Sequence, residues 1–414
     1  MRFPPIFSLA IGNATRWWGR NGVAALDNCY NIFDLRAAAK RRLPKGVFEF
    51  VDRATEDHLA LAANRSAFED VKLRHRSLVD VSGRSTKTML FGKPAALPMV
   101  IAPTGAAGLC WYRGELALAK AAAAAGIPLT LSTASMTAME TIADQAGGRL
   151  WFQLYVWKRR DLSYQIIERA KNAGYEALIV TVDSAVAPNR EYNSRNGFAL
   201  PFNTSPRFLL DVALHPAWTL GVMGRYLTTI GMPKHENYPT QFQGTITSGS
   251  AGRTDEMRLD SLNWDDIAVF RDKWPGILML KGVNRIDDAL KALTYGVDGI
   301  IVSNHGGRNM DSAAATLDVL PEIAGAVGDK CTVILDSGIR RGSDVVKAMA
   351  LGAKAVLTGR ATLYGTAVGG QDGAAKAISI IKTEMDKTMA YTGCNTVDEI
   401  STDIFFQDWR SNQH

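Results

Sequence analysis

Short apolar runs rich in β-branched residues recur along the chain from residue 97 onward, and stretches with helical periodicity separate most of them. Each run has the length and composition of a buried parallel strand. The runs lie at 97–103, 127–133, 150–156, 177–183, 277–283, 299–304, 331–338 and 355–360. Between them, patterns such as GELALAKAAAAAG and RGSDVVKAMALG carry the glycine that often ends a helix before the next strand. Eight successive units of this kind predict an α/β protein with a (β/α)8 TIM barrel.

The residues before the first predicted strand, 1–96, have a different pattern. Two stretches in this region, 31–44 and 47–70, have helical character. They predict an N-terminal helical cap over one end of the barrel. The barrel itself is expected over 97–385, and a C-terminal tail over 386–414.

Composition excludes several classes of protein. With 47% apolar and 21% charged residues among 414, the chain has the material for a large core and is not disordered. The net charge of +6 is mild and scattered, which suits an anionic substrate or a membrane surface and does not indicate nucleic acid. Four widely spaced cysteines indicate neither a disulfide framework nor a metal site, and they favour a reducing, cytoplasmic location. The opening residues 1–18 lack the features of a signal peptide, and no spanning helix is expected.

Polar residues follow the ends of all eight predicted strands. They are Pro103-Thr104-Gly105, Ser132-Thr133, Gln153 with Tyr155, Thr181 with Asp183, Lys281, Ser303-Asn304-His305, Asp336-Ser337-Gly338 and Gly359-Arg360. In a (β/α)8 barrel these strand ends meet at one face, where active sites lie. A barrel without a site would need few of them, because a buried polar group without a partner costs about 1 to 3 kcal/mol. The sequence therefore predicts a binding site at this face.

The segment SNHGGRNMD (303–311) is the most specific short signal in the chain. His305 has a pKa range suited to a general base, the two glycines allow a ligand to approach the backbone, and Arg308 offers a fork for a carboxylate. A histidine alone in a tight turn is more often structural. Arg308 and the nearby strand-end residue Asp183 favour the catalytic interpretation.

Two further segments, DSGIRRGSD (336–344) and TGR (358–360), follow the seventh and eighth strands. Barrels commonly bind phosphate there, through glycine backbone N–H groups, a helix N-terminus and arginines. The alternative is a pair of glycine turns beside solvated arginines. Because both segments have the same character, we predict a cofactor that carries a phosphate.

These motifs carry a resemblance. LPKGVFEF, APTG, LSTAS, WFQLYV, TVDSAVAPNR, LKG, SNHGGR, DSGIRRGSD and GRATLYG occur in the order and at the spacing of the FMN-dependent α-hydroxy acid oxidases and dehydrogenases, over about residues 31–409. This family includes glycolate oxidase and the lactate and mandelate dehydrogenases. LSTAS and PTG are most similar to the (S)-mandelate dehydrogenases. The resemblance implies an FMN enzyme that oxidises a 2-hydroxy acid to the 2-oxo acid.

The resemblance also implies roles for individual residues. His305 would be the catalytic base, paired with Asp183, and Lys281 would stabilise the reduced flavin. Arg190 and Arg308 would clamp the substrate carboxylate, with Tyr155 as a further donor. The residues expected to bind FMN are Pro103, Thr104, Gly105, Ser132, Gln153, Thr181, Lys281, Ser303, Asp336, Gly338, Arg340, Gly359 and Arg360. Residue identity does not decide whether the α-hydrogen leaves as a proton or as a hydride.

Three positions distinguish this chain within the family. Phe50 stands where relatives have a tyrosine that binds the substrate carboxylate, and such a lost hydrogen bond costs about 1.5 to 3 kcal/mol. Either Arg190 and Arg308 suffice to bind the substrate carboxylate, another donor replaces the tyrosine hydroxyl, or the substrate is not a simple 2-hydroxy acid. Ala134 replaces a bulky tryptophan of the short-chain oxidases and leaves room for an aromatic substrate. Gly105 replaces an alanine common in oxidases and favours a dehydrogenase.

The stretch from about 184 to 276 is longer than an ordinary connection between strand and helix, and it predicts an insertion after the fourth strand. Its apolar segment 208–232 contains Asp211, Arg225 and a central proline, which argue against a spanning helix but fit an interfacial one. The resemblance implies membrane association for this segment, on the inner face, and a tetrameric assembly. The alternative is a packing surface or a subunit contact.

The sequence leaves open which molecule accepts the electrons. A quinone or another membrane carrier is the leading expectation. The alternatives are an oxidase that produces hydrogen peroxide, and a flavin-binding protein without turnover.

Overall fold

The computed structural model of the chain describes residues 26–198, 205–246 and 260–406. Eight parallel strands close into a barrel, in the order β10, β3, β4, β5, β6, β7, β8 and β9. Their bounds are β3 (Met99–Ile101), β4 (Leu129–Ser132), β5 (Leu150–Leu154), β6 (Ala177–Thr181), β7 (Ile277–Val283), β8 (Gly299–Val302), β9 (Thr332–Asp336) and β10 (Ala355–Thr358). Each lies within one of the eight predicted runs, so the predicted (β/α)8 barrel is confirmed. The signal-peptide prediction concerns residues that lie outside the described part of the chain.

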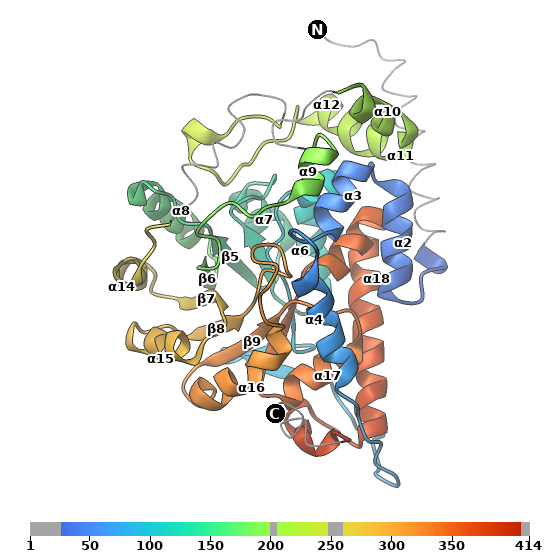
Figure 1. The fold of residues 1–414 in the computed structure, drawn as a ribbon, viewed down its shortest axis with the longest axis vertical. Helices are drawn as coiled ribbons and strands as arrows, with labels where there is room; N and C mark the ends of the chain where they lie inside the picture. Colours follow the sequence, from blue (N-terminus) through green and yellow to red (C-terminus); the bar gives the residue numbers. More distant parts are fainter. Residues whose placement is uncertain (1–25, 199–204, 247–259, 407–414) are drawn as a thin grey trace.

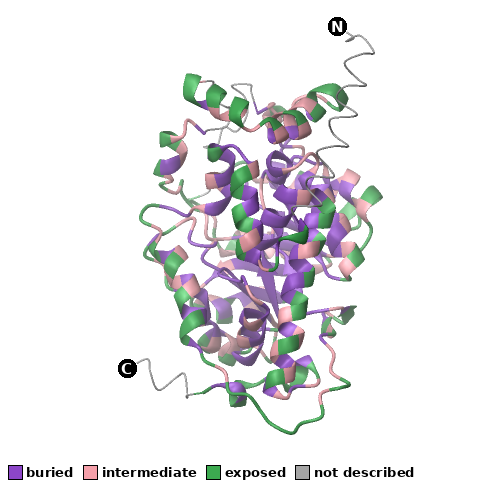
Figure 2. Ribbon diagram, turned by 90° about the vertical axis from the view of Figure 1, so that its right-hand side faces the viewer, coloured by how far each residue is buried: buried purple, intermediate pink, exposed green. Residues whose placement is uncertain are grey.

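Helices surround the barrel (Figure 1). They are α5 (Ala107–Cys110), α6 (Gly114–Ala125), α7 (Met139–Ala146), α8 (Arg160–Asn172), α14 (Trp264–Lys273), α15 (Ile286–Thr294), α16 (Thr316–Val327), α17 (Gly342–Ala350) and α18 (Arg360–Thr392). The two patterns with a terminal glycine, at α6 and α17, are confirmed as helices. Gly126 ends α6 in the left-handed conformation, with φ of 67°. The strands are almost entirely buried beneath these helices, whose outer faces are exposed (Figure 2).

The N-terminal region forms three helices, α2 (Ile32–Arg42), α3 (Lys45–Asp52) and α4 (Leu59–Asp70). The helical stretch predicted over 47–70 is wrong in one respect, because the chain leaves the helix after Asp52 and resumes it at Leu59. In the break, Thr55 donates its N–H to the carbonyl oxygen of Gly307 at 3.0 Å and its hydroxyl to that of Asn189 at 2.7 Å. Hydrogen bonds to two loops of the barrel replace those of a continuous helix.

A hairpin that the sequence did not predict, β1 (Thr88–Leu90) and β2 (Lys93–Ala95), precedes the barrel. The described part of the insertion contains short helices: α9 (Glu191–Arg195), α10 (Pro206–Leu214), α11 (Pro216–Trp218), η1 (Thr219–Gly224), α12 (Arg225–Thr229) and η2 (Thr240–Phe242). Helices α10 to α12 lie at the end of the molecule beyond the cap, at the top of Figure 1. Within the described residues no helix is long and apolar enough to cross a membrane.

One side of α10 to α12 is anchored to the protein. Phe208, Trp218, Val222 and Tyr226 are buried, and the Trp218 indole donates a hydrogen bond to the carbonyl oxygen of Leu109 at 2.5 Å. The other side exposes large apolar side chains: Leu209, Leu210, Leu214, Leu220, Leu227 and Ile230. We call these six residues the leucine face. The predicted apolar segment therefore both packs on the protein and presents an apolar surface.

The last helix, α18, is bent sharply at Gly369 and Gly370, whose backbone leaves the helical conformation. The bend brings the backbones of Gly365 and Gly373 together, and a Cβ at Gly373 would lie 1.9 Å from the carbonyl oxygen of Gly365. No side chain fits such a gap. The helix continues to Thr392, so the predicted boundary between barrel and tail at residue 385 falls inside it.

We therefore expect Gly373→Ala to lower stability by at least about 1 to 3 kcal/mol, because the added methyl group forces the two halves of α18 apart. Gly325→Ala is the matched control, since Gly325 is an exposed helical position where a Cβ meets nothing within 4 Å. The control should be neutral or up to about 1 kcal/mol more stable. Thermal and urea unfolding of the two variants check this, and equal stabilities would contradict the close contact.

Candidate active site

A cavity of about 270 Å³ lies at the C-terminal ends of the strands, and the predicted site residues converge on it. Those that line it are Phe50, Pro103, Thr104, Gly105, Ser132, Ala134, Gln153, Tyr155, Thr181, Arg190, Lys281, His305, Arg308, Asp336, Gly338, Arg340, Gly359 and Arg360. The other two, Asp183 and Ser303, lie behind His305 and Lys281 and contact them directly. Most of the group belongs to the predicted strand ends; Phe50, Ala134, Arg190, Arg308 and Arg340 came from the family resemblance or from other motifs.

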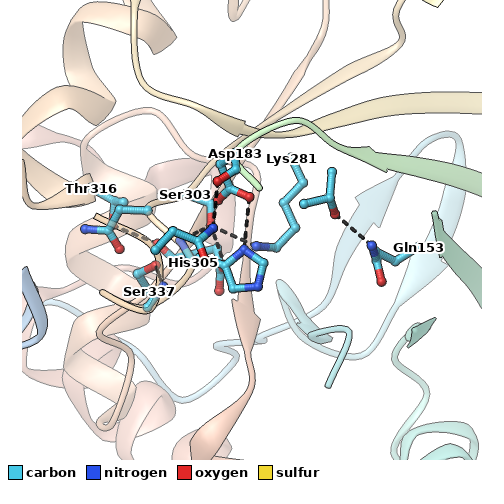
Figure 3. Close-up of polar contacts among 12 residues, drawn as sticks. Gln153, Asp183, Lys281, Ser303, His305, Thr316 and Ser337 are labelled. Carbon is cyan, nitrogen blue, oxygen red and sulfur yellow. Dashed lines mark hydrogen bonds and ion pairs between the residues drawn. The ribbon is translucent and has the colours of Figure 1, made fainter. Parts of the chain in front are cut away.

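The His305 side chain is held from two sides, one of them by Asp183 (Figure 3). Its Nδ1 lies 3.0 Å from Oδ1 of Asp183, and its Nε2 lies 3.2 Å from the hydroxyl of Tyr155. Because a carboxylate accepts, Nδ1 carries the proton, and Nε2 presents its lone pair to the cavity side. His305 itself has a φ of 58°, and Gly306 and Gly307 follow with 65° and 72°. This left-handed turn is costly for a histidine and fixes where its ring points.

Electrostatics favours a neutral imidazole beside an ionised carboxylate. Burial lowers the pKa of His305, and the opposing attraction of Asp183 does not compensate. Burial alone would raise the pKa of Asp183, but the His305 hydrogen bond and the nearby Lys281 ammonium lower it overall. At neutral pH the pair can therefore accept a proton at Nε2.

A second buried charge, Lys281, is fixed on the cavity wall. Its Nζ lies 2.9 Å from Oδ2 of Asp336 and 2.9 Å from the hydroxyl of Ser303. The Ser303 hydroxyl donates to Asp336 at 2.6 Å and accepts the backbone N–H of His305 at 3.0 Å. Although burial opposes it, the carboxylates of Asp336 and Asp183 raise the pKa of Lys281, so the ammonium stays charged. Ser303 thus links the lysine to the turn that carries His305.

A chain of polar side chains crosses three neighbouring strands at the floor of the cavity. Ser132 donates to Oε1 of Gln153 at 2.9 Å, and Nε2 of Gln153 donates to the hydroxyl of Thr181 at 2.9 Å. All three side chains are buried. Their mutual hydrogen bonds fix the orientation of the Gln153 amide, which suits recognition of a flat polar ring edge.

Arginines give the cavity an excess of positive charge. Burial, with the neighbouring Arg308 guanidinium, lowers the pKa of Arg190 to about 9 and that of Arg360 to about 10. In the described structure, none of these three side chains forms an ion pair with a carboxylate; they donate to backbone carbonyl oxygens instead. Buried cations without counter-charges are unfavourable. The cavity is therefore suited to anionic ligands.

One end of the cavity has the features of a phosphate site. Helix α18 begins at Arg360, and no side chain caps its N-terminus at Gly359, so its first N–H groups are available to an anion. Gly338 has a φ of 85°, and a Cβ there would lie 2.5 Å from the carbonyl oxygen of Asn64. The buried Arg340 adds a positive charge. This end fits the phosphate of a nucleotide cofactor.

Phe50 lies with its ring 5.2 Å from the Arg308 guanidinium carbon and 5.3 Å from the ring of Phe198. The Arg308 guanidinium also donates to the carbonyl oxygen of Phe50 at 2.8 Å. At the position where the resemblance implies a tyrosine hydroxyl, this chain thus has a ring that packs against the arginine.

Several lining residues were not predicted: Val51, Ala102, Ile339, Leu357 and Leu363. All of them are apolar, and an apolar residue beside a strand end carries no chemical signal that distinguishes a cavity-lining residue from a core residue. Ser337 and Gly306, which the sequence placed at the strand ends and in the glycine turn, also line the cavity, and Ser337 accepts the Gly306 N–H at 2.9 Å.

Comparison with known sequences agrees with this geometry. The family model for FMN-dependent dehydrogenases matches residues 39–407. The chain is 40% identical over 385 residues to (S)-mandelate dehydrogenase of Pseudomonas putida, covering 93% of this chain and 96% of that one. It is 41% identical to an L-lactate oxidase of a Nostoc strain, covering 92% of this chain and 99% of that one.

Comparison with solved structures gives the same result. A crystal structure of the monotopic membrane protein (S)-mandelate dehydrogenase superposes with a TM-score of 0.86 at 39% identity, covering 91% of this chain and 99% of that one. A mandelate oxidase variant with bound (S)-mandelic acid superposes with a TM-score of 0.75 at 35% identity, covering 90% of this chain and 96% of that one. The cofactor, the fold and the resemblance are thereby confirmed. The chain belongs to the FMN-dependent dehydrogenase family and is an FMN-dependent 2-hydroxy acid dehydrogenase.

Proposed function

We propose that the enzyme oxidises an (S)-2-hydroxy acid with a bulky or aromatic side chain to the 2-oxo acid, and that its electrons pass to a quinone or another membrane carrier. The observation that carries the proposal is the pairing of His305 with Asp183 in a cavity that also holds Arg190 and Arg308. A base and a carboxylate clamp in one cavity are the two functions that a 2-hydroxy acid requires.

The oxidation removes two electrons and two protons from the carbon and the hydroxyl of R–CH(OH)–COO⁻. FMN, held by the residues of the polar floor and the phosphate end, would accept the two electrons together with the second proton. His305 takes one proton at Nε2, and Asp183 stabilises the imidazolium that results. Lys281 places a fixed positive charge in the same cavity, where it favours negative charge on a bound ring. The residues proposed to hold FMN are those of the polar floor and of the phosphate end.

Arg190 and Arg308 are proposed to bind the substrate carboxylate. The Arg190 guanidinium donates to the carbonyl oxygen of Arg308 at 3.3 and 3.2 Å, which places the two residues together. Tyr155 supplies a further hydroxyl beside His305. Two arginines provide a charge-assisted clamp without the hydroxyl that Phe50 lacks.

The room for a large substrate side chain comes from two small residues. A Cβ on Gly105 would lie 3.1 Å from the Cβ of Ala134, so the two positions are direct neighbours on the same wall of the cavity. Larger residues at either position would fill this space. The similarity to a mandelate dehydrogenase and to a mandelate oxidase supports an aromatic substrate.

An oxidase that reduces oxygen is the second candidate, because the L-lactate oxidase of Nostoc is as similar to this chain as the dehydrogenases are. The two candidates share every step at the substrate. They differ in reoxidation, which is measured by mixing the reduced enzyme with oxygen or with a soluble quinone. Faster reoxidation by the quinone supports the dehydrogenase, and faster reoxidation by oxygen supports the oxidase.

We further propose that the leucine face docks on the cytoplasmic side of a membrane. Its side chains are exposed on α10, on η1, and on and just after α12, and the exposed cations Arg207 and Arg225 lie on α10 and α12. An apolar face with flanking cations is typical of interfacial helices. The similar (S)-mandelate dehydrogenase is a monotopic membrane protein. The tetramer that the family implies stays a prediction.

We expect His305→Gln to keep FMN bound and to slow flavin reduction by about 100- to 10,000-fold, because the general base is lost. In the unchanged enzyme, the reduction rate should fall as the pH drops through a His305 pKa below the ordinary histidine value, since the imidazolium cannot accept a proton. Anaerobic stopped-flow absorbance measures both. Near-normal reduction by the variant, or a rate independent of pH, would overturn the assignment of the base.

Substrate size is tested with Ala134→Trp. A tryptophan there fills the space beside Gly105, so kcat/KM for (S)-mandelate should fall about 10- to 200-fold relative to that for L-lactate. Ala134→Ser, which adds little volume, is the control and should keep the ratio. An unchanged ratio in the tryptophan variant would show that the substrate side chain lies elsewhere.

Docking is tested by changing Leu210 and Leu214 to glutamine together. The full-length protein should bind vesicles of mixed anionic and zwitterionic phospholipid at least about tenfold more weakly, because each buried leucine contributes about 1.5 to 3 kcal/mol. Leu78 and Leu290, which are exposed on other parts of the surface, give the matched control pair. Equal vesicle binding by both double variants, in a sedimentation assay, would rule out the leucine face.

A further inference from the structure

A short stretch of the insertion, His235 to Tyr238, lies against the loop between β4 and α7 and is hydrogen-bonded to it at four points. Glu236 donates its N–H to the carbonyl oxygen of Ser135 at 3.1 Å, and His235 Nδ1 lies 3.1 Å from the carbonyl oxygen of Ala134. The Asn237 side chain accepts the N–H of Met139 at 2.9 Å and donates to the carbonyl oxygen of Thr137 at 3.2 Å. The insertion therefore braces the loop that carries the proposed substrate wall.

His235 is built into the protein as a neutral donor. It is 6% exposed, and its ring stacks on Tyr238 with centroids 4.5 Å apart. Burial lowers the pKa of His235, so the imidazole is uncharged at neutral pH. Because a carbonyl oxygen can only accept, the proton lies on Nδ1 and points at Ala134.

Both the carbonyl oxygen and the backbone N–H of Ala134 are hydrogen-bonded. The carbonyl oxygen accepts the N–H of Ala106 at 3.2 Å as well as the His235 donor. The N–H donates to the hydroxyl of Ser132 at 3.1 Å, which belongs to the polar floor of the cavity. Ala106 directly follows Gly105, so the same carbonyl oxygen ties together both small residues of the substrate wall. Of these three hydrogen-bond partners of Ala134, His235 is the one that belongs to the insertion.

We propose that His235 is a positioning residue that sets the size of substrate side chain the enzyme accepts, by holding the Ala134 carbonyl and thereby the wall formed by Ala134 and Gly105. The inference rests on the proposed function, in which that wall faces the substrate side chain. When the donor is lost, the loop keeps its other hydrogen bonds but the wall shifts. A bulky side chain that fills the space is then bound less well, whereas a small one that does not reach the wall is unaffected.

The test compares binding of phenylacetate and acetate to the full-length, FMN-loaded protein, followed by the change in flavin absorbance. His235→Phe retains a ring to stack on Tyr238 and removes the donor. We expect its Kd for phenylacetate to rise about tenfold, the equivalent of one ordinary hydrogen bond, and its Kd for acetate to stay the same. His235→Asn, whose amide can donate to the same carbonyl oxygen, should restore selectivity. The ratio of kcat/KM for (S)-mandelate and L-lactate should follow the binding ratio.

His215→Phe is the matched control. His215 lies in the same insertion, and its Nδ1 also contacts a backbone carbonyl oxygen, that of Asp211 at 2.7 Å, away from the cavity. This variant should leave both affinities unchanged. If His235→Phe does not fold, the pair His235→Asn and His235→Leu makes the same comparison, since the two side chains have similar size and only asparagine donates.

The results of this test distinguish a failure of the proposal for His235 from a failure of the proposed function. An equal loss for both ligands, no loss for either, or the same shift in His215→Phe would each overturn the proposal for His235. A wild-type enzyme whose flavin no 2-hydroxy acid reduces would instead contradict the proposed function. The binding ratio would still decide the role of His235, because it does not depend on turnover.

Discussion

Positive charge buried at one end of the barrel is the constraint on which the rest of the structure depends. Arg308 and Arg360 have no carboxylate partner in the described structure, and their guanidinium groups donate to carbonyl oxygens of the cap at Phe50, Val51 and Arg53. These bonds hold the cap over the strand ends. Arg360 also donates to the carbonyl oxygen of Gly306, beside the turn that carries His305. The same arginines thus join α3 to the strand ends, contact the turn that carries His305 and favour the binding of anionic ligands.

The positive charge of Lys281 and those of the arginines are compensated in different ways in this cavity. Lys281 is paired with Asp336 and Ser303, so its charge is fixed in place and already compensated. The arginines are compensated only by backbone dipoles, so a carboxylate or a phosphate improves their environment when it binds. This contrast fits the proposal that one cavity holds a permanent charge on one wall and binds two anions, the cofactor phosphate and the substrate carboxylate, at others.

The insertion contacts two regions of the protein: the segment that follows the first barrel strand, and the wall of the cavity. Trp218 anchors its helices on Leu109, while Tyr226 accepts the N–H of Arg113, both in the region that follows the first barrel strand. A few residues further along, His235 contacts Ala134 at the cavity wall. The surface proposed to meet a membrane and the wall proposed to meet the substrate therefore belong to one packed unit.

The sequence by itself determined the eight strands, the residues at their ends and the family, because strand periodicity and short motifs are local properties. Only the tertiary structure decided the break at Thr55, where hydrogen bonds to Gly307 and Asn189 outweigh a locally helical pattern. It also decided that Asp183 stands behind His305 rather than on the cavity wall. The role proposed for His235 had no local signal, since its partner Ala134 lies about a hundred residues away in the chain. Such contacts depend on how distant segments pack, and a pattern within one segment does not contain that information.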